Sequence, residues 1–206
     1  MLPKVSVHRF PSAPFTNVET YRRIVGGELI DEIEALSRDL KGVRICHLNS
    51  TGFGGGVAEL LSRLVPLARA VGLEADWRLI QGTPDFFRVT KAIHNALQGA
   101  AHELTDSDEA IYLHVNHESA KLLEADYDVF FVHDPQPAAF REAAGARGSK
   151  WIWRCHIDLT QPHPELWAYL RKFIDRYDVA IISREDYRQE VPLPQLVFPP
   201  AINPFN

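Results

Sequence analysis

The sequence predicts an α/β fold: a doubly wound, mostly parallel, Rossmann-like sheet with helices on both faces. One observation is a set of short runs that are apolar throughout, such as Val-Phe-Phe-Val at 129–132. Such runs are typical of strands that are buried on both faces. A second observation is that these runs alternate with segments whose apolar residues recur at helical spacing, which is the pattern of a parallel sheet.

The first part of the chain is expected to be an arm. Residues 1–20 include three prolines and show no sustained hydrophobic period, so we expect an extended segment with a short edge strand near 5–7. Apolar residues recur over 21–40, with helical spacing in the later part, and Lys41-Gly42 is a typical helix end.

Strands and helices then alternate to the end of the chain. Strands are predicted at 43–48, 74–80, 128–133, 150–156, 179–183 and 195–198. Helices are predicted from the glycine-rich turn to Gly72, and at 83–97, 107–123, 136–144 and 164–177. Pro84 suits the first turn of its helix, and Ser107 or Asp108 is the expected cap of the next one. We therefore expect one domain over 21–198, followed by a proline-rich segment, 199–206, that begins a linker.

Composition narrows the class of protein. The chain has 206 residues, a net charge of −5, 46% hydrophobic and 24% charged residues, which is ordinary for a soluble globular protein. It has no Lys/Arg run, and no apolar run approaches the roughly 20 residues needed to span a bilayer. Neither a secretory signal nor a disulfide framework is visible. We expect a cytoplasmic protein without a nucleic-acid or membrane partner.

A glycine-dense turn follows the strand at 43–48. It reads Asn-Ser-Thr-Gly-Phe-Gly-Gly-Gly over 49–56 and runs into a helical pattern. A strand, a glycine loop and a helix N-terminus together can present backbone N–H groups to an anion. The spacing matches neither the dinucleotide fingerprint nor the P-loop. A tight turn without a ligand explains the loop equally well.

Polar residues also follow two other predicted strands. Asp134 comes directly after 128–133, while Arg154, His156 and Asp158 lie at the end of 150–156. Ligands of open α/β sheets bind beyond the carboxyl ends of the strands, so these residues form a candidate site. Asp134 is either a helix cap or a carboxylate for a sugar hydroxyl or a proton. His156 is either a core histidine or a ligand contact.

Several motifs together resemble a known family. They are His47 to Glu59, Val132 to Pro137 and Trp153 to Asp158, supported by Tyr21 to Gly26 and Asp85 to Gly99. They resemble the N-terminal half of retaining glycosyltransferases of family 4, in the branch of the trehalose glycosyltransferring synthases and trehalose phosphorylases. The resemblance extends from about residue 20 to the end of the chain.

The resemblance implies one half of a GT-B fold, in which two Rossmann-like domains face each other across a cleft. The N-terminal domain holds the acceptor sugar, and the C-terminal domain binds the nucleotide-sugar donor. By this resemblance the catalytic residues are Asp134 and His156. The donor diphosphate contacts Gly54, Gly55 and Gly56, and the sugar-binding residues are Asn49, Ser50, Arg154 and Asp158.

The expected function is the acceptor-binding half of a retaining glucosyltransferase. It would form trehalose from a nucleoside-diphosphate glucose and glucose, with no cofactor and no metal. No donor domain follows in this sequence, so we expect inactivity unless a donor-binding domain or chain is supplied. The alternative is a non-enzymatic sugar-binding or interaction module that associates with itself through its exposed cleft face. The missing Gly-x-Gly-x-x-Gly disfavours a Rossmann oxidoreductase.

Overall fold

The computed structural model describes residues 6–7, 17–146 and 148–201, and its centre is a sheet of seven strands. The strand order is β1-β3-β2-β4-β5-β6-β7; β1 runs antiparallel to β3, and the other six strands are parallel. The strands are β1 Ser6–Val7, β2 Arg44–Asn49, β3 Glu74–Leu79, β4 Val129–His133, β5 Lys150–Arg154, β6 Val179–Ile182 and β7 Gln195–Val197. The predicted doubly wound, mostly parallel sheet is confirmed.

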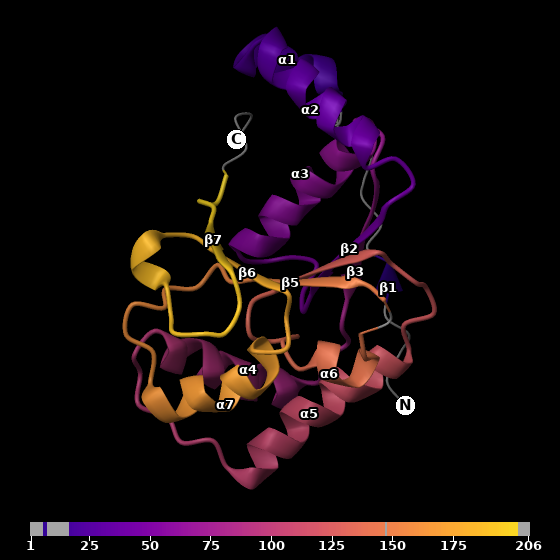
Figure 1. Ribbon diagram of the computed structural model, residues 1–206. Helices are drawn as coiled ribbons and strands as arrows, with labels where there is room; N and C mark the ends of the chain where they lie inside the picture. The colour runs from indigo at the N-terminus through magenta and orange to yellow at the C-terminus, as the bar shows by residue number, and fades with distance from the viewer. Residues whose placement is uncertain (1–5, 8–16, 147, 202–206) are drawn as a thin grey trace.

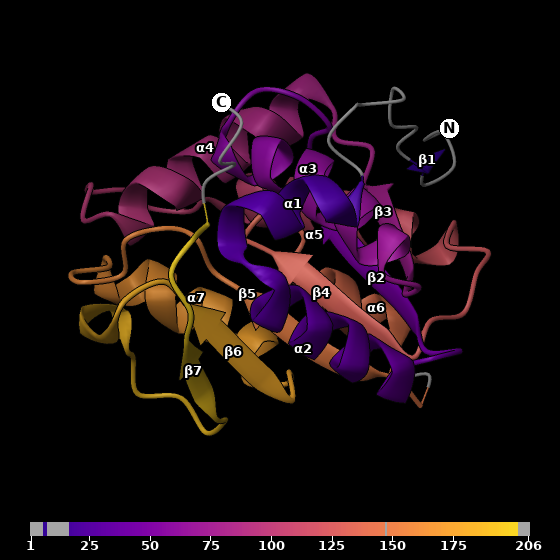
Figure 2. The same ribbon diagram turned by 90° about the horizontal axis from the view of Figure 1, so that it is seen from above.

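Helices cover both faces of the sheet. They are α1 Val18–Val25, α2 Gly27–Asp39, α3 Gly56–Ala70, α4 Pro84–Leu97, α5 Asp106–Lys121, α6 Phe140–Ala144 and α7 Pro164–Ile174, with a 3₁₀ turn at Glu185–Tyr187. Figure 1 shows α1, α2 and α3 above the sheet and α4 to α7 below it. Seen from above in Figure 2, α1 and α2 lie across the middle strands.

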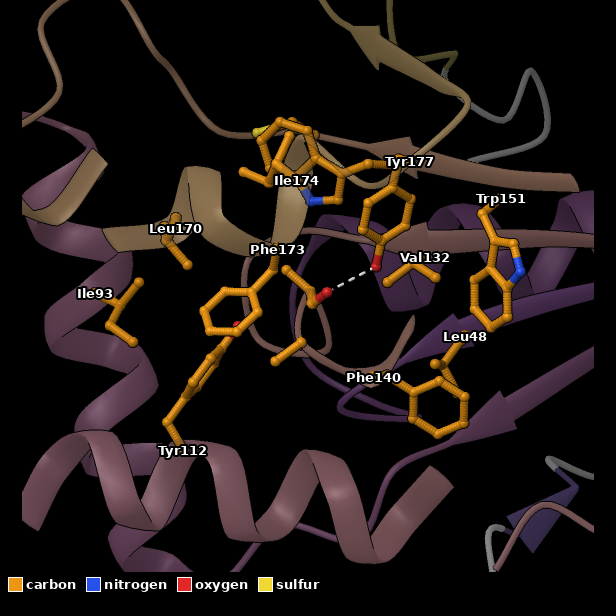
Figure 3. Close-up of a cluster of buried hydrophobic side chains, with 14 of the residues drawn as sticks. Leu48, Ile93, Tyr112, Val132, Phe140, Trp151, Leu170, Phe173, Ile174 and Tyr177 are labelled. Atoms are coloured by element: carbon orange, nitrogen blue, oxygen red, sulfur yellow. Dashed lines mark hydrogen bonds between the residues drawn. The ribbon is translucent and has the colours of Figure 1, made fainter. Parts of the chain in front are cut away.

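The larger core lies between the sheet and the helices α4 to α7. Its strand residues include Phe130 and Trp151, whose rings stack with centroids 4.1 Å apart. Figure 3 shows Tyr112 and Phe173 reaching into the same cluster from helices α5 and α7, and Tyr177 from the turn between α7 and β6. A fully buried Phe or Trp side chain contributes several kcal/mol, so this layer anchors the fold.

The opposite face has a smaller core. There α3 packs Leu61 and Val65 against Trp77 of β3. The α1–α2 hairpin, in contrast, leaves much of its apolar surface exposed; its exposed apolar residues are Ile24, Val25 and Leu29, together with Leu36 and the following Leu40. The two layers of the domain therefore differ in how completely they are packed.

The helical spacing in the later part of 21–40 is confirmed by α2, which Gly26, with a φ of 91°, separates from α1. Two other local predictions were wrong in detail. The helix predicted at 107–123 begins at Asp106, and its cap is Thr105, which forms a capping box with Asp108. The helix predicted at 136–144 is confined to Phe140–Ala144 and follows a turn.

The ends of the chain are described only in part. The edge strand expected near 5–7 is confirmed for Ser6–Val7. The rest of the expected arm up to residue 16, and residues 202–206 of the expected linker, lie outside the described residues. No helix within the described ranges is long and apolar enough to cross a membrane.

Candidate functional site

The site lies where the direction of winding of the sheet reverses. From β2 the chain passes through α3 to β3 on one side, and it then returns to place β4 on the other side of β2. At such a switch point the loops after the two central strands diverge and leave a crevice. The loop after β2 and the turn after β4 form the two walls of this crevice.

The loop after β2 is folded largely by its own side chains. The side chain of Asn49 accepts a hydrogen bond from the Ser50 N–H (2.7 Å) and donates one to the Thr51 carbonyl (3.0 Å). The Thr51 hydroxyl donates to the carbonyl of Phe53 (2.8 Å). Gly54 and Gly55 have φ of 70° and 93°, which favour glycine, and α3 begins directly after them at Gly56.

Space remains open beside these glycines. A Cβ atom built on Gly54, Gly55 or Gly56 would meet nothing within 4 Å. Packing within the domain therefore does not require glycine at Gly56, where φ is not positive either. The loop leaves backbone N–H groups and a helix N-terminus accessible to an anion.

Asp134 forms the opposite wall and is held by three hydrogen bonds. Its N–H donates to the Arg154 carbonyl (2.9 Å), its carbonyl accepts from Trp153 Nε1 (3.1 Å), and its Oδ1 accepts from the His156 N–H (2.7 Å). These contacts fix a φ of 64°, and Asp134 is the single non-glycine residue with positive φ among the described residues. Strained backbone of this kind clusters at ligand-binding sites.

Burial controls the protonation of Asp134. It raises the pKa of this carboxyl to about 7, although the His156 N–H and the nearby Arg154 both act to lower it. A carboxyl group with such a pKa can hold or release a proton near neutral pH.

Three histidines from neighbouring strands form a chain behind this wall. His47 Nδ1 lies 3.1 Å from His133 Nε2, and His133 Nδ1 lies 3.0 Å from His156 Nε2. Burial lowers the pKa of His47 and of His156 to about 4, and Arg154 adds to the effect on His156. Burial, the neighbouring imidazoles of His47 and His156, and Arg154 lower the pKa of His133 well below its usual value. All three rings are therefore neutral at neutral pH.

Arg154 is bonded to a distant part of the chain, and Asp158 to a residue close to it in the sequence. Arg154 is the last residue of β5, and its Nη2 donates to the carbonyl of Phe198 (2.7 Å). Asp158 accepts hydrogen bonds from the backbone N–H (2.8 Å) and the hydroxyl (2.6 Å) of Thr160, and these bonds lower its pKa.

Both walls enclose a cavity of about 710 Å³. Of the nine predicted site residues, eight line it: Asn49, Ser50, Gly54, Gly55, Gly56, Asp134, His156 and Asp158. Arg154 lies outside this lining, and its role in sugar binding stays a prediction. A second hollow of about 620 Å³ adjoins the cavity, and Ser50, Thr51, Gly54, His94 and Gln136 line both. Within the described residues, no group of three or more His, Cys, Asp or Glu side chains is arranged to hold a metal ion.

Sequence reasoning missed several residues of the site. His94 and Gln98 of the α4 region line the cavity. His47 was overlooked because it lies inside an apolar strand; a single polar residue in a buried run was the available signal. Its pairing with His133 depends on strand register, which local sequence does not reveal.

A family model for "Trehalose synthase, N-terminal domain" matches residues 47–189. The chain belongs to this family. The match contains the glycine loop and every residue of the histidine chain, and the fold is one Rossmann-like half of the GT-B type.

Individual trehalose synthases support the same assignment. The chain is 47% identical over 193 residues to the trehalose synthase of Rubrobacter xylanophilus, covering 90% of this chain and 46% of that protein. It is 44% identical over 197 residues to the trehalose synthase of Pyrococcus horikoshii, covering 92% and 46%. The chain thus spans about half the length of these curated relatives.

A solved structure supports the fold. A trehalose-6-phosphate synthase superposes with a TM-score of 0.58 at 16% identity, over 79% of this chain and 50% of that one. At this identity the similarity concerns the fold alone.

Proposed function

We propose that this chain is the acceptor-binding half of a retaining glucosyltransferase that forms trehalose from a nucleoside-diphosphate glucose and glucose. The observation that carries the proposal is the cavity at the switch point, which is lined by the glycine loop, the first turn of α3, a carboxyl and a neutral histidine. The trehalose synthases that the chain resembles at 44–47% identity support trehalose as the product.

In the proposed reaction, the glucose hydroxyl attacks the anomeric carbon on the face that the diphosphate leaves. The bond between that carbon and the diphosphate oxygen breaks as the new glycosidic bond forms, and the hydroxyl proton passes to a phosphate oxygen. N–H groups at 54–56 stabilise the charge that develops on the diphosphate. Asp134 and His156 hold sugar hydroxyls beside the reacting carbon.

The donor would be held chiefly by a second domain or chain, with no cofactor and no metal. By this proposal residues 1–206 alone form no trehalose. A chimera tests this: the chain is joined to the remaining part of the Rubrobacter xylanophilus trehalose synthase, and trehalose formation from nucleotide-glucose and glucose is measured by anomer-resolved NMR.

We expect the chimera to form α,α-trehalose and the isolated chain to form none. His156→Ala in the chimera should lower the rate by about a hundredfold or more. The matched control is His114→Ala, which removes an exposed histidine on α5, on the other side of the sheet. A folded chimera without activity, or equal losses in both variants, would contradict the proposal.

A second candidate function is a sugar-binding or interaction module without enzymatic activity. The exposed apolar residues of the α1–α2 hairpin favour it, because a surface of this kind suits self-association or a protein partner. This alternative predicts an inactive chimera, glucose binding in the millimolar range, no nucleotide binding, and association that sedimentation would detect.

A further inference from the structure

The three histidines His47, His133 and His156 come from three adjacent parallel strands or their ends. β2 pairs with β4 and β4 with β5, so the register places the rings side by side on one face of the sheet. His47 also stacks on Phe131, with ring centroids 4.9 Å apart, and the rings of His133 and His156 are nearly parallel, at 18°. His156 alone of the three lines the cavity.

The atoms that meet restrict where the protons can be. A neutral imidazole has one N–H, so three neutral rings have three. The two ring-to-ring hydrogen bonds use two of them. His133 bonds through both nitrogens, so it donates in one bond and accepts in the other. The third N–H must then lie at one end of the chain, on His47 Nε2 or on His156 Nδ1.

We propose that His47 and His133 are positioning residues that set whether His156 presents an N–H or a lone pair to a sugar hydroxyl in the cavity. If the bonds run from His47 toward His156, the cavity end is a donor. If they run the other way, it is an acceptor. The direction of both hydrogen bonds reverses when the proton in each bond moves to the other nitrogen, one end of the chain loses its N–H and the other end gains one. No ring has to flip, and all three rings are neutral again afterwards. The sugar ligand in this statement rests on the proposed function; the coupled rings do not.

This geometry makes a specific prediction about tautomers. In the first arrangement all three rings are protonated on Nδ1, and in the second all three are protonated on Nε2. Mixed sets would break one of the two bonds. We therefore expect the three rings always to share one tautomer.

The first test is NMR of the chain with ¹⁵N-labelled histidine near neutral pH. The expected result is a shared tautomer for His47, His133 and His156, with scalar coupling between nitrogens across both bonds. The exposed His114 is the internal reference for an uncoupled ring. A mixed set of tautomers, or a charged imidazolium among the three, would overturn the proposal.

The second test uses two variants of His47 and titration with glucose. His47→Phe removes the partner of His133 Nε2, and we expect the tautomer of His156 to change and glucose to bind about three- to tenfold more weakly, as for one lost hydrogen bond. His47→Asn has an amide that can donate or accept where Nδ1 lies, and it should restore both readouts. His114→Phe is the matched control.

The outcomes separate the two proposals. If His47→Phe binds glucose more weakly but the tautomer of His156 does not change, the role of His47 is merely structural and the inference is overturned. The same holds if His47→Asn does not restore glucose binding and the tautomer. If the wild-type chain binds no glucose while its three rings share a tautomer, the proposed function fails and the histidine unit stands. If His47→Phe does not fold, the wild-type spectrum still decides.

Discussion

The two walls of the cavity are built in opposite ways. On the Asp134 side, three hydrogen bonds hold one residue, and two buried rings, His47 and His133, support His156 from behind. On the loop side, three glycines leave open space, and Phe53 at the loop tip is 85% exposed. The first wall is held by bonds from neighbouring residues of the domain, whereas the second leaves open space beside its backbone. Preorganisation is therefore concentrated where sugar hydroxyls would be held.

The largest loss of stability is expected when the side chain that supports Asp134 is removed. Trp153→Ala deletes a fully buried side chain whose Nε1 holds the Asp134 carbonyl, so we expect a loss of about 3–5 kcal/mol in the free energy of unfolding. Phe53→Ala, on the loop, should change it by less than about 0.5 kcal/mol. Urea titrations measure both, and similar losses in the two variants would remove the distinction between the walls.

The next effect concerns the charge of Asp134. Burial raises its pKa to about 7, so the folded protein keeps a proton that the unfolded chain releases above about pH 4. This contribution to stability is present below pH 4 and is lost as the pH rises through 7. Asp134→Asn retains the shape, the acceptor for the His156 N–H and tolerance of positive φ.

We expect Asp134→Asn to be roughly 2–3 kcal/mol more stable than the wild type at pH 8, with the difference vanishing near pH 4. His47 and His156 have the opposite effect on stability. Their pKa values are lowered to about 4 in the folded protein, so the unfolded chain binds protons first and the folded state loses stability as the pH falls from 6.5 through about 4. Both histidines are present in the wild type and in Asp134→Asn, so their effect largely cancels in the difference between the two free energies of unfolding. Denaturant titrations from pH 4 to pH 8 would contradict this account if the difference stayed constant.

The smallest effect belongs to the loop. Gly55→Ala places a Cβ on a residue with φ of 93°, and we expect a loss of about 1–2 kcal/mol from backbone strain. At Gly56 φ is not positive and the space around it is open. Gly56→Ala should therefore change the free energy of unfolding, measured by thermal denaturation, by less than about 0.5 kcal/mol. In the chimera, however, Gly56→Ala should lower trehalose formation, because a diphosphate would approach the same backbone. Unchanged activity would show that no ligand does so.

Much of the fold could be predicted because its signals are local. Apolar runs marked β2, β4 and β6 to within one or two residues, and Thr83-Pro84 gave the start of α4. The start of α5 was misplaced because one residue outweighed the periodic pattern: Thr105 caps this helix in place of Ser107 or Asp108.

The site was predictable to the extent that it follows strand ends. Asp134 and His156 could be found because parallel strands end at a common edge. The histidine chain could not, because its bonds join residues 86 and 23 positions apart through strand register. The anchoring of Arg154 to the carbonyl of Phe198 depends in the same way on the path of the chain after β7.

The edges of the sheet have a consequence for behaviour at high concentration. Within the described residues, β1 pairs with the last two residues of β3, Arg78 and Leu79. In the middle of β3 the carboxylate of Asp76 is paired with Arg69 and Arg78. The other edge, β7, is only three residues long. A strand of three residues offers few unpaired backbone groups to a second molecule, which limits association through this edge at high concentration.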